Sequence, residues 1–120
     1  MTEWIGVDLD GTLAKYTEWK EDGGIGEPIQ PMIDRVKDWL KNGQEVRIMT
    51  ARANAKVTHP EEKLSGEEFA RYQITLIEEW CEKHIGTKLP VTCEKDYQML
   101  ELWDDRCRQV KFNTGEAYEV

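Results

Sequence analysis

The stretch Trp4-Ile5-Gly6-Val7-Asp8-Leu9-Asp10-Gly11-Thr12-Leu13-Ala14 decides the fold, because an apolar run ends there at two closely spaced carboxylates. We expect residues 4–7 to form a strand that carries both acids to its carboxyl end, where open α/β sheets bind ligands. Side chains alternate along a strand, so Asp8 and Asp10 are expected to start on one side, with Gly11 permitting a sharp turn beyond them. Such a pair suits Mg²⁺ and phosphate chemistry, although Asp and Gly are also common at ordinary strand-to-turn junctions.

Three further segments place polar groups at or near the ends of predicted strands. Residues 46–49 form a predicted strand that ends in the hydroxyl of Thr50. Lys95 follows the short predicted strand 91–93 and supplies a flexible cation. Residues 100–103 lead into Asp104 and Asp105, a second pair of acids. The sequence therefore predicts acids, a hydroxyl and a cation in one region of a sheet.

In this order the four elements resemble the signature of the haloacid dehalogenase superfamily of phosphohydrolases, and the resemblance covers nearly the whole chain. The DxDGT box corresponds to residues 8–12, and the threonine, lysine and acidic-pair elements follow it. An isolated DxD is a weak signal, whereas DxDGTLA with all three partners in order is a strong one. The resemblance implies an α/β fold of three layers, Rossmann-like, with a central parallel sheet and no cap domain.

The resemblance also implies a Mg²⁺-dependent phosphatase with a role for each matching residue. Asp8 would be the nucleophile that accepts the phosphoryl group as an aspartyl-phosphate. Asp10 would protonate the leaving oxygen and later activate water, with its backbone carbonyl on the metal. Thr50 and Lys95 would hold the phosphate oxygens.

Metal and substrate ligands follow from the same resemblance. The implied Mg²⁺ ligands are four acids: Asp8, Asp10, Asp104 and Asp105, of which either member of the last pair could bind directly. The implied substrate-binding positions flank the catalytic ones: Gly11, Thr12, Ala51 and Arg52. Independently of the family, Mg²⁺ prefers oxygen ligands, so a set of acids without His or Cys fits it better than zinc. A divalent cation and Lys95 would offset the repulsion between a carboxylate nucleophile and a phosphate dianion.

Length and composition predict one small domain that spans residues 1–120. A chain of 120 residues, 39% of them hydrophobic, can bury one modest core. It has no apolar run of membrane-spanning length and no signal-sequence pattern at its start, so we expect a cytoplasmic protein without membrane contact. The three cysteines form no CxxC pair, and His59 and His84 lack a second ligand at metal-binding spacing.

Between the predicted strands the pattern is helical. Residues 31–41 predict a first crossover helix opened by a proline and closed by Gly43. Residues 65–68 resemble a capping box before a second helix that reaches about Ile85 and stops at Gly86. The expected packing residues of this second helix are apolar and aromatic: Phe69, Tyr72, Leu76, Trp80 and Ile85. Alternating strands and helices favour a parallel sheet, and we expect a last strand at 110–112 and a turn at 113–115.

Two loops are long enough to affect substrate choice. Residues 13–30 predict a flap over the site, in which Tyr16 or Trp19 could stack on a base. The loop after Thr50 offers Arg52, Lys56 and His59 to a phosphorylated substrate. Neither gap between the signature elements is long enough for a cap domain, so we expect an open site.

Charge selects among substrate classes. A net charge of −8 opposes binding of a polyanion, which favours a small phosphorylated substrate such as a nucleotide. A phosphatase that acts on the terminal phosphate of a nucleic acid is the alternative within the same chemistry. Two rivals are not enzymes: a Mg²⁺-binding phosphoacceptor module like a response-regulator receiver, and a degenerate metal-binding scaffold. In receivers the acid pair comes early and the single Asp later, the reverse of the order here.

Overall fold

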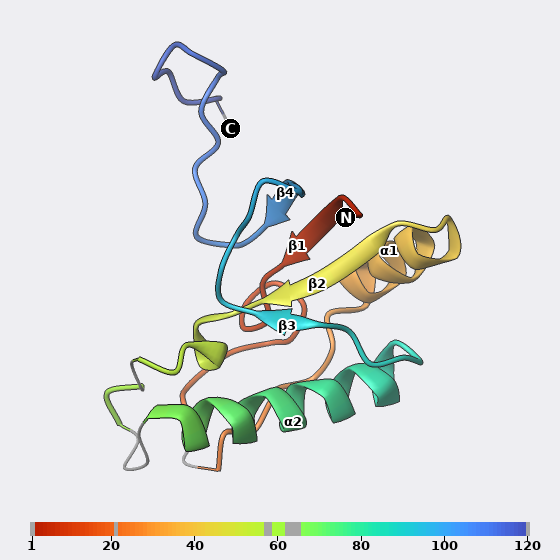
Figure 1. The fold of residues 1–120 in the computed structure, drawn as a ribbon, viewed down its shortest axis with the longest axis vertical. Helices are drawn as coiled ribbons and strands as arrows, with labels where there is room; N and C mark the ends of the chain where they lie inside the picture. Colours follow the sequence, from red (N-terminus) through yellow and green to blue (C-terminus); the bar gives the residue numbers. More distant parts are fainter. Residues whose placement is uncertain (1, 21, 57–58, 62–65, 120) are drawn as a thin grey trace.

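The computed structural model describes residues 2–20, 22–56, 59–61 and 66–119 of the chain, which form a small α/β domain (Figure 1). Its sheet has four parallel strands in the order β3-β2-β1-β4. They are β1 (Trp4–Val7), β2 (Glu45–Met49), β3 (Val91–Thr92) and β4 (Met99–Trp103). The strands lie where the sequence predicts them. Because all run in one direction, their carboxyl ends meet at one edge of the sheet.

Two α-helices and one short 3₁₀ helix connect these strands. Helix α1 (Gln30–Lys41) has a proline in its first turn, where a missing N–H costs no intrahelical bond. Helix α2 (Gly66–His84) is followed by Gly86, which has a positive φ of 105°. The 3₁₀ helix η1 (Ala51–Ala53) begins directly after Thr50. Both α-helix predictions are confirmed in position; the first residue of the predicted capping box, Ser65, lies outside the described residues.

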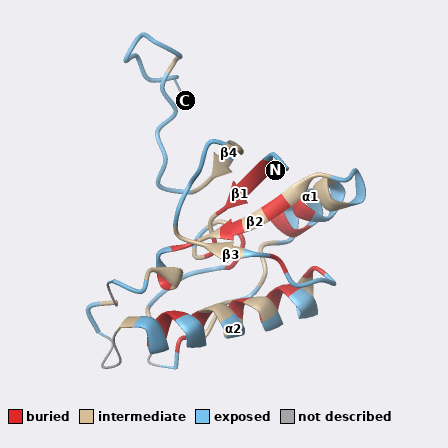
Figure 2. Ribbon diagram, in the orientation of Figure 1, coloured by how far each residue is buried: buried red, intermediate tan, exposed pale blue. Residues whose placement is uncertain are grey.

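The hydrophobic core lies between one face of the sheet and both helices. Strand residues of alternating positions point to it and are buried: Ile5, Val7, Val46 and Ile48. Helix α1 adds Met32, Ile33 and Val36, and helix α2 adds Ile77, Trp80 and Cys81. Figure 2 shows the buried residues on β1, β2 and one side of each helix. Both helices share a face because β1, β2 and β3 follow one another in one direction, with right-handed crossovers.

The opposite face of the sheet carries no helix among the described residues. The chain returns from β3 to β4 through residues 93–98 without one. Trp4 is nevertheless fully buried on this side, where the guanidinium of Arg47 lies 4.6 Å from its ring and Asp96 accepts a 2.9 Å hydrogen bond from its indole N–H. The parallel α/β sheet with crossover helices is therefore confirmed, whereas the described helices form one layer and not the two that a three-layer fold requires.

The predicted packing face of helix α2 is confirmed in part. Phe69, Trp80 and Ile85 are buried as predicted, whereas Tyr72 is 46% exposed and Leu76 is only partly buried. The buried stripe also contains residues that the prediction left out: Ala70, Gln73, Ile77 and Cys81. Its spacing of three and four residues admits a polar glutamine into the buried stripe.

The chain after β4 does not add a strand to the sheet. Residues 107–119 extend away from the body of the domain (Figure 1), and Val110 and Phe112 are exposed. A single antiparallel bridge joins Val110 to Ala117 around a turn in which Asn113 and Gly115 have positive φ. The predicted strand at 110–112 is therefore wrong, because nothing in the sheet pairs with it, and the predicted turn at 113–115 is confirmed. None of the helices in the described part of the chain is long and apolar enough to cross a membrane.

Candidate active site

Three acids meet where two neighbouring strands end. Asp8 follows β1, and Asp104 and Asp105 follow β4. After a register shift between Trp4 and Ile5, the two strands pair regularly up to their carboxyl ends, where the Asp8 N–H donates to the Trp103 carbonyl at 2.9 Å. One carboxylate oxygen from each acid lies within 4.8 Å of the other two. Parallel pairing thus joins acids that are nearly a hundred positions apart in the sequence.

The remainder of the DxDGT box organises this acid cluster. The Thr12 hydroxyl oxygen lies 3.3 Å from Asp8 Oδ2 and 3.2 Å from Asp105 Oδ1, and it accepts a 3.0 Å hydrogen bond from the Asp105 N–H. Gly11 has a φ of +90°, and a β-carbon there would lie 2.8 Å from Asp105 Oδ2. A side chain at position 11 would therefore push Asp105 away. Both residues were expected to bind substrate, and the structure uses them to hold the acids together.

Crowding changes the protonation of Asp8. Burial is the largest of the causes that together raise the pKa of Asp8 from 3.8 to about 7. The other causes are a hydrogen bond with Asp105 and the negative charges of Asp104, Asp105 and Asp10. Each effect disfavours negative charge on Asp8. The cluster therefore gains most from a cation that binds all three carboxylates.

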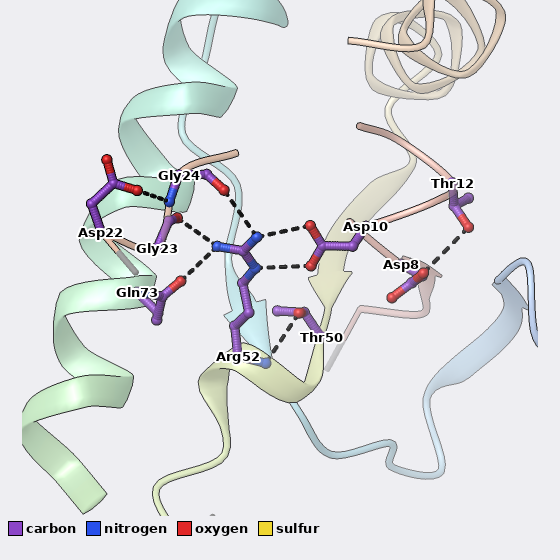
Figure 3. A network of polar contacts seen from close by, with 9 residues as sticks. All are labelled: Asp8, Asp10, Thr12, Asp22, Gly23, Gly24, Thr50, Arg52 and Gln73. Carbon is purple, nitrogen blue, oxygen red and sulfur yellow. Dashed lines mark hydrogen bonds and ion pairs between the residues drawn. The ribbon is translucent and has the colours of Figure 1, made fainter. Parts of the chain in front are cut away.

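Asp10 faces away from the acid cluster. Its two oxygens accept hydrogen bonds of 2.8 Å and 2.9 Å from Nε and Nη2 of Arg52, which form a bidentate ion pair (Figure 3). Strand β1 ends at Val7, and the chain then turns, so that the N–H groups of Leu13 and Ala14 both donate to the Leu9 carbonyl. The alternation expected for Asp8 and Asp10 is wrong for this reason: the strand stops before either acid. Only Asp8 of the first box lies in the acid cluster.

Arg52 has no donor left for a substrate. Its side chain is buried, and the residue is 6% exposed. Besides the Asp10 ion pair, Nη1 donates to the Gly23 carbonyl at 2.6 Å and to Gln73 Oε1 at 2.8 Å, and Nη2 donates to the Gly24 carbonyl at 3.2 Å. These contacts use all five N–H groups of the guanidinium. Substrate binding by Arg52, which also lines the cavity, stays a prediction; in this structure its donors bind Asp10, the flap and helix α2.

A cavity of about 670 Å³ opens beside the acids. Asp8, Asp104 and Asp105 line one part of it, and Thr50 and Ala51 line the part next to β2. Four aromatic and imidazole side chains also line it: Tyr16, Trp19, His59 and Phe69. The cavity therefore combines an anionic cluster with an apolar wall.

The two flap aromatics are not equivalent. The Trp19 ring stacks on His59 with centroids 4.3 Å apart and an interplanar angle of 7°, and the Arg52 guanidinium lies 4.8 Å from the Trp19 ring. Trp19 thus joins the flap to the loop after η1. Tyr16 is 43% exposed beside the cavity and keeps a ring available for contact. Lys56 is exposed and does not line the cavity.

Of the two residues predicted to bind phosphate, Thr50 lines the cavity and Lys95 does not. Thr50 is buried and lines the cavity, and its hydroxyl accepts a 3.2 Å hydrogen bond from the Arg52 N–H. Lys95 is exposed and does not line the cavity. Among the described residues, the lysines and arginines that do line it are Arg52, which is fully paired, and Arg106. Arg106 follows the acidic pair, and its N–H donates to Asp104 Oδ1 at 2.8 Å.

Sequence reasoning missed Arg106 and Gln73. Arg106 had a signal, since it is a cation next to a predicted acidic pair. Gln73 had one too: it lies four residues from Phe69 and from Ile77, so that it is a polar residue in an apolar helical row. The carbonyls of Gly23 and Gly24 had none, because any residue carries a carbonyl.

Comparison with known proteins found no family model, no curated protein and no solved structure that matches this chain. Assignment to the haloacid dehalogenase superfamily therefore stays a prediction from the sequence motifs. The function of the protein is accordingly inferred from the geometry of the site and from the order of those motifs.

Proposed function

We propose that this protein is a Mg²⁺-dependent phosphatase that hydrolyses a small phosphomonoester through an aspartyl-phosphate on Asp8. The observation that carries the proposal is the convergence of Asp8, Asp104 and Asp105 beside a cavity at the carboxyl edge of the sheet, where Thr12 joins Asp8 to Asp105. The order of the sequence motifs supports the same chemistry. Ligands of open parallel sheets bind at this edge.

The donor set fits Mg²⁺. Three carboxylates supply only hard oxygen ligands, and neither His nor Cys belongs to the cluster in the described part of the chain. Ligand oxygens on opposite sides of Mg²⁺ are about 4.2 Å apart, so oxygens within 4.8 Å need only a small approach. When bound, the cation would neutralise the acids and the phosphate oxygens. Asp8, Asp104 and Asp105 would hold it through their carboxylates, and the backbone carbonyl of Asp10 would be a further ligand.

In the proposed first step an oxygen of Asp8 attacks the phosphorus of the substrate. The ester P–O bond breaks, and the leaving oxygen takes a proton from Asp10, so that the products are a free alcohol and an acyl phosphate on Asp8. In the second step water attacks this phosphorus while Asp10 takes its proton. The bond to Asp8 breaks, which restores the carboxylate and releases inorganic phosphate.

The ion pair with Arg52 constrains what Asp10 can do in each step. As a carboxylate it keeps a lone pair on each oxygen beside the Arg52 bond, so it can accept a proton from water in place. As an acid it carries the proton on such a lone pair, and the protonated oxygen accepts more weakly from Arg52. Arg52 can therefore hold the direction of Asp10 in both steps.

Cavity size and charge favour a small substrate, with a nucleotide as the leading class. About 670 Å³ is within the range of pockets that enclose drug-sized ligands. The exposed Tyr16 ring could pack on a base or another flat group, and Arg106 could contact the phosphate. A net charge of −8 disfavours long nucleic acids.

The test is a panel of phosphoesters with and without Mg²⁺: nucleoside monophosphates, sugar phosphates, an aryl phosphate and a terminally phosphorylated oligonucleotide. Release of phosphate should require Mg²⁺ and should be abolished in Asp8→Asn but not in Asp38→Asn, a change of an exposed acid on α1. Acid quench with a radiolabelled substrate should trap label on the wild type and none on Asp8→Asn. No turnover with any ester, or turnover by Asp8→Asn, would refute the proposal.

A further inference from the structure

Arg52 connects the proposed acid–base residue to two distant parts of the fold. Its five donors are shared among Asp10, the flap carbonyls of Gly23 and Gly24, and Gln73 of α2 (Figure 3). A guanidinium is planar and rigid, so fixing some of its N–H groups fixes the direction of the others. The positions of Gln73 and of the flap therefore fix the direction of Nε and Nη2, the two Arg52 nitrogen atoms that hold Asp10.

The side chain of Gln73 has one hydrogen-bond partner in the described part of the chain, which is Arg52. It is fully buried in the apolar row of α2, between Phe69 and Ile77 in the four-residue spacing. Its Oε1 accepts from Arg52 Nη1 at 2.8 Å, and its Nε2 has no hydrogen-bond partner among the described residues. Burying an amide with an unpaired N–H is unfavourable, and an apolar side chain would fill the same space without that penalty. The bond to Arg52 is the one hydrogen bond that the side chain of Gln73 makes in the described part of the chain.

The flap approaches Gln73 closely at a glycine. Gly23 has a φ of +72°, and a β-carbon there would overlap Gln73 Nε2. The same turn is held to α2 by the Tyr72 hydroxyl, which donates to the Asp22 carbonyl at 3.1 Å, and is closed by the Gly24 N–H, which donates to Asp22 Oδ1 at 2.8 Å. A flap that moves away from α2 removes the acceptors of two of the five Arg52 donors.

From these contacts we propose that Gln73 and the flap carbonyls of Gly23 and Gly24 act as positioning groups that orient Asp10 through Arg52. With the flap against α2, the guanidinium is fixed by its contacts to Gln73, Gly23 and Gly24 and holds the carboxyl of Asp10 in one direction. When one of these acceptors is removed, the guanidinium is free to turn, and Asp10 is no longer held in the direction that proton transfer requires. This inference rests on the proposed phosphatase function.

The test variant is Gln73→Met, which keeps the length of the side chain and removes the amide acceptor. Its matched control is Ile77→Met, one turn along the same buried row and without a polar contact. If Gln73 positions Asp10, Gln73→Met should lower kcat about tenfold for an alkyl phosphate, whose leaving group needs a proton, and less than twofold for a p-nitrophenyl phosphate, with KM unchanged. Ile77→Met should change both substrates equally. An equal loss for both substrates in Gln73→Met would show a merely structural role and overturn the inference.

A second measurement does not depend on catalysis. In the substrate-free protein labelled with ¹⁵N-arginine, the Arg52 Nε–H should exchange slowly with solvent, and its signal can be assigned by its disappearance in Arg52→Lys. Exchange should be at least tenfold faster in Gln73→Met and in Gly23→Ala, which displaces the flap, and unchanged in Ile77→Met. Unchanged exchange in both variants would overturn the inference even in an active enzyme. Absence of activity together with accelerated exchange would refute the phosphatase function and leave the coupling of the flap to Arg52 intact.

Discussion

Replacement of Asp8 by Asn should stabilise the metal-free protein at alkaline pH while it removes the proposed nucleophile. The structure places Asp8 partly buried beside two other acids, where its negative charge is unfavourable. Asn has nearly the same shape and keeps an oxygen that can accept from Thr12. The substitution therefore removes a charge with little change in packing.

The size of the effect follows from the pKa of Asp8. A rise from 3.8 to about 7 corresponds to at most roughly 4 kcal/mol, since one pKa unit is worth about 1.4 kcal/mol. Asp8 is only partly buried, and solvent screening reduces this limit, so we expect a gain of about 1 to 2 kcal/mol in the free energy of unfolding.

The sign depends on pH. Because the pKa of Asp8 is higher in the folded state than in the unfolded chain, the folded state binds more protons between pH 4 and 7. The wild type loses this part of its stability as pH rises from the unfolded pKa through the folded one. The advantage of Asp8→Asn should therefore be small near pH 4 and complete above pH 7.

Urea unfolding with a chelator at pH 5 and pH 8 measures this difference. Addition of Mg²⁺ at pH 8 should stabilise the wild type and should stabilise Asp8→Asn less, because a cation relieves the same repulsion. Asp10→Asn is the contrasting variant: it weakens a buried ion pair and should destabilise by about 2 to 4 kcal/mol at both pH values. A gain in Asp8→Asn that is equal at pH 5 and pH 8, or no gain at all, would refute the crowding of these acids.

The remaining predictions concern substrate and metal. If Arg106 binds the substrate phosphate in place of Lys95, Arg106→Ala should raise KM about tenfold or more, the value of one hydrogen bond to a charged group, and Lys95→Ala should change KM less than twofold. Steady-state kinetics with an aryl phosphate tests this ranking. The opposite ranking would return the phosphate-binding role to Lys95. Asp105→Ala should raise the Mg²⁺ concentration for half-maximal activity more than Asp104→Ala does, because Asp105 is held by Thr12 against Asp8; a Mg²⁺ titration of both variants tests this order. Tyr16→Ala should raise KM for a nucleoside monophosphate about tenfold or more, the value of base stacking, and should spare a small aryl phosphate, whereas Trp19→Ala should affect both substrates because Trp19 packs on His59 and Arg52. Equal effects of Tyr16→Ala on both substrates would argue against contact with a base.

Local patterns were sufficient for the elements that depend on local chemistry. The strand at β1, the helix α1 with its proline and the end of α2 before Gly86 all follow from apolar periodicity and from residues with restricted or unusual backbone angles. The placement of Asp8, Asp104 and Asp105 at one edge also follows from the sequence, because parallel strands share a carboxyl edge. For the buried side of α2 the prediction held at Phe69, Trp80 and Ile85 and failed at Tyr72, which is exposed, because the size of a side chain does not fix the side of the helix on which it lies.

Contacts between distant segments could only be learned from the tertiary structure. The motif identifies Asp10 and Arg52 as site residues, but only the fold shows that they pair, since the direction of Asp10 depends on where β1 stops and how the turn at Leu9 closes. The same is true of Gln73, which looks like an ordinary helix residue until α2 is packed against the flap. By itself the sequence determined which strands, helices and acids form the edge of the sheet, because alternation, capping and turn chemistry act over a few residues. Which cationic side chain lines the cavity, which face of the sheet receives helices and what holds Asp10 were decided by the tertiary structure, because they depend on side chains brought together from far apart in the chain.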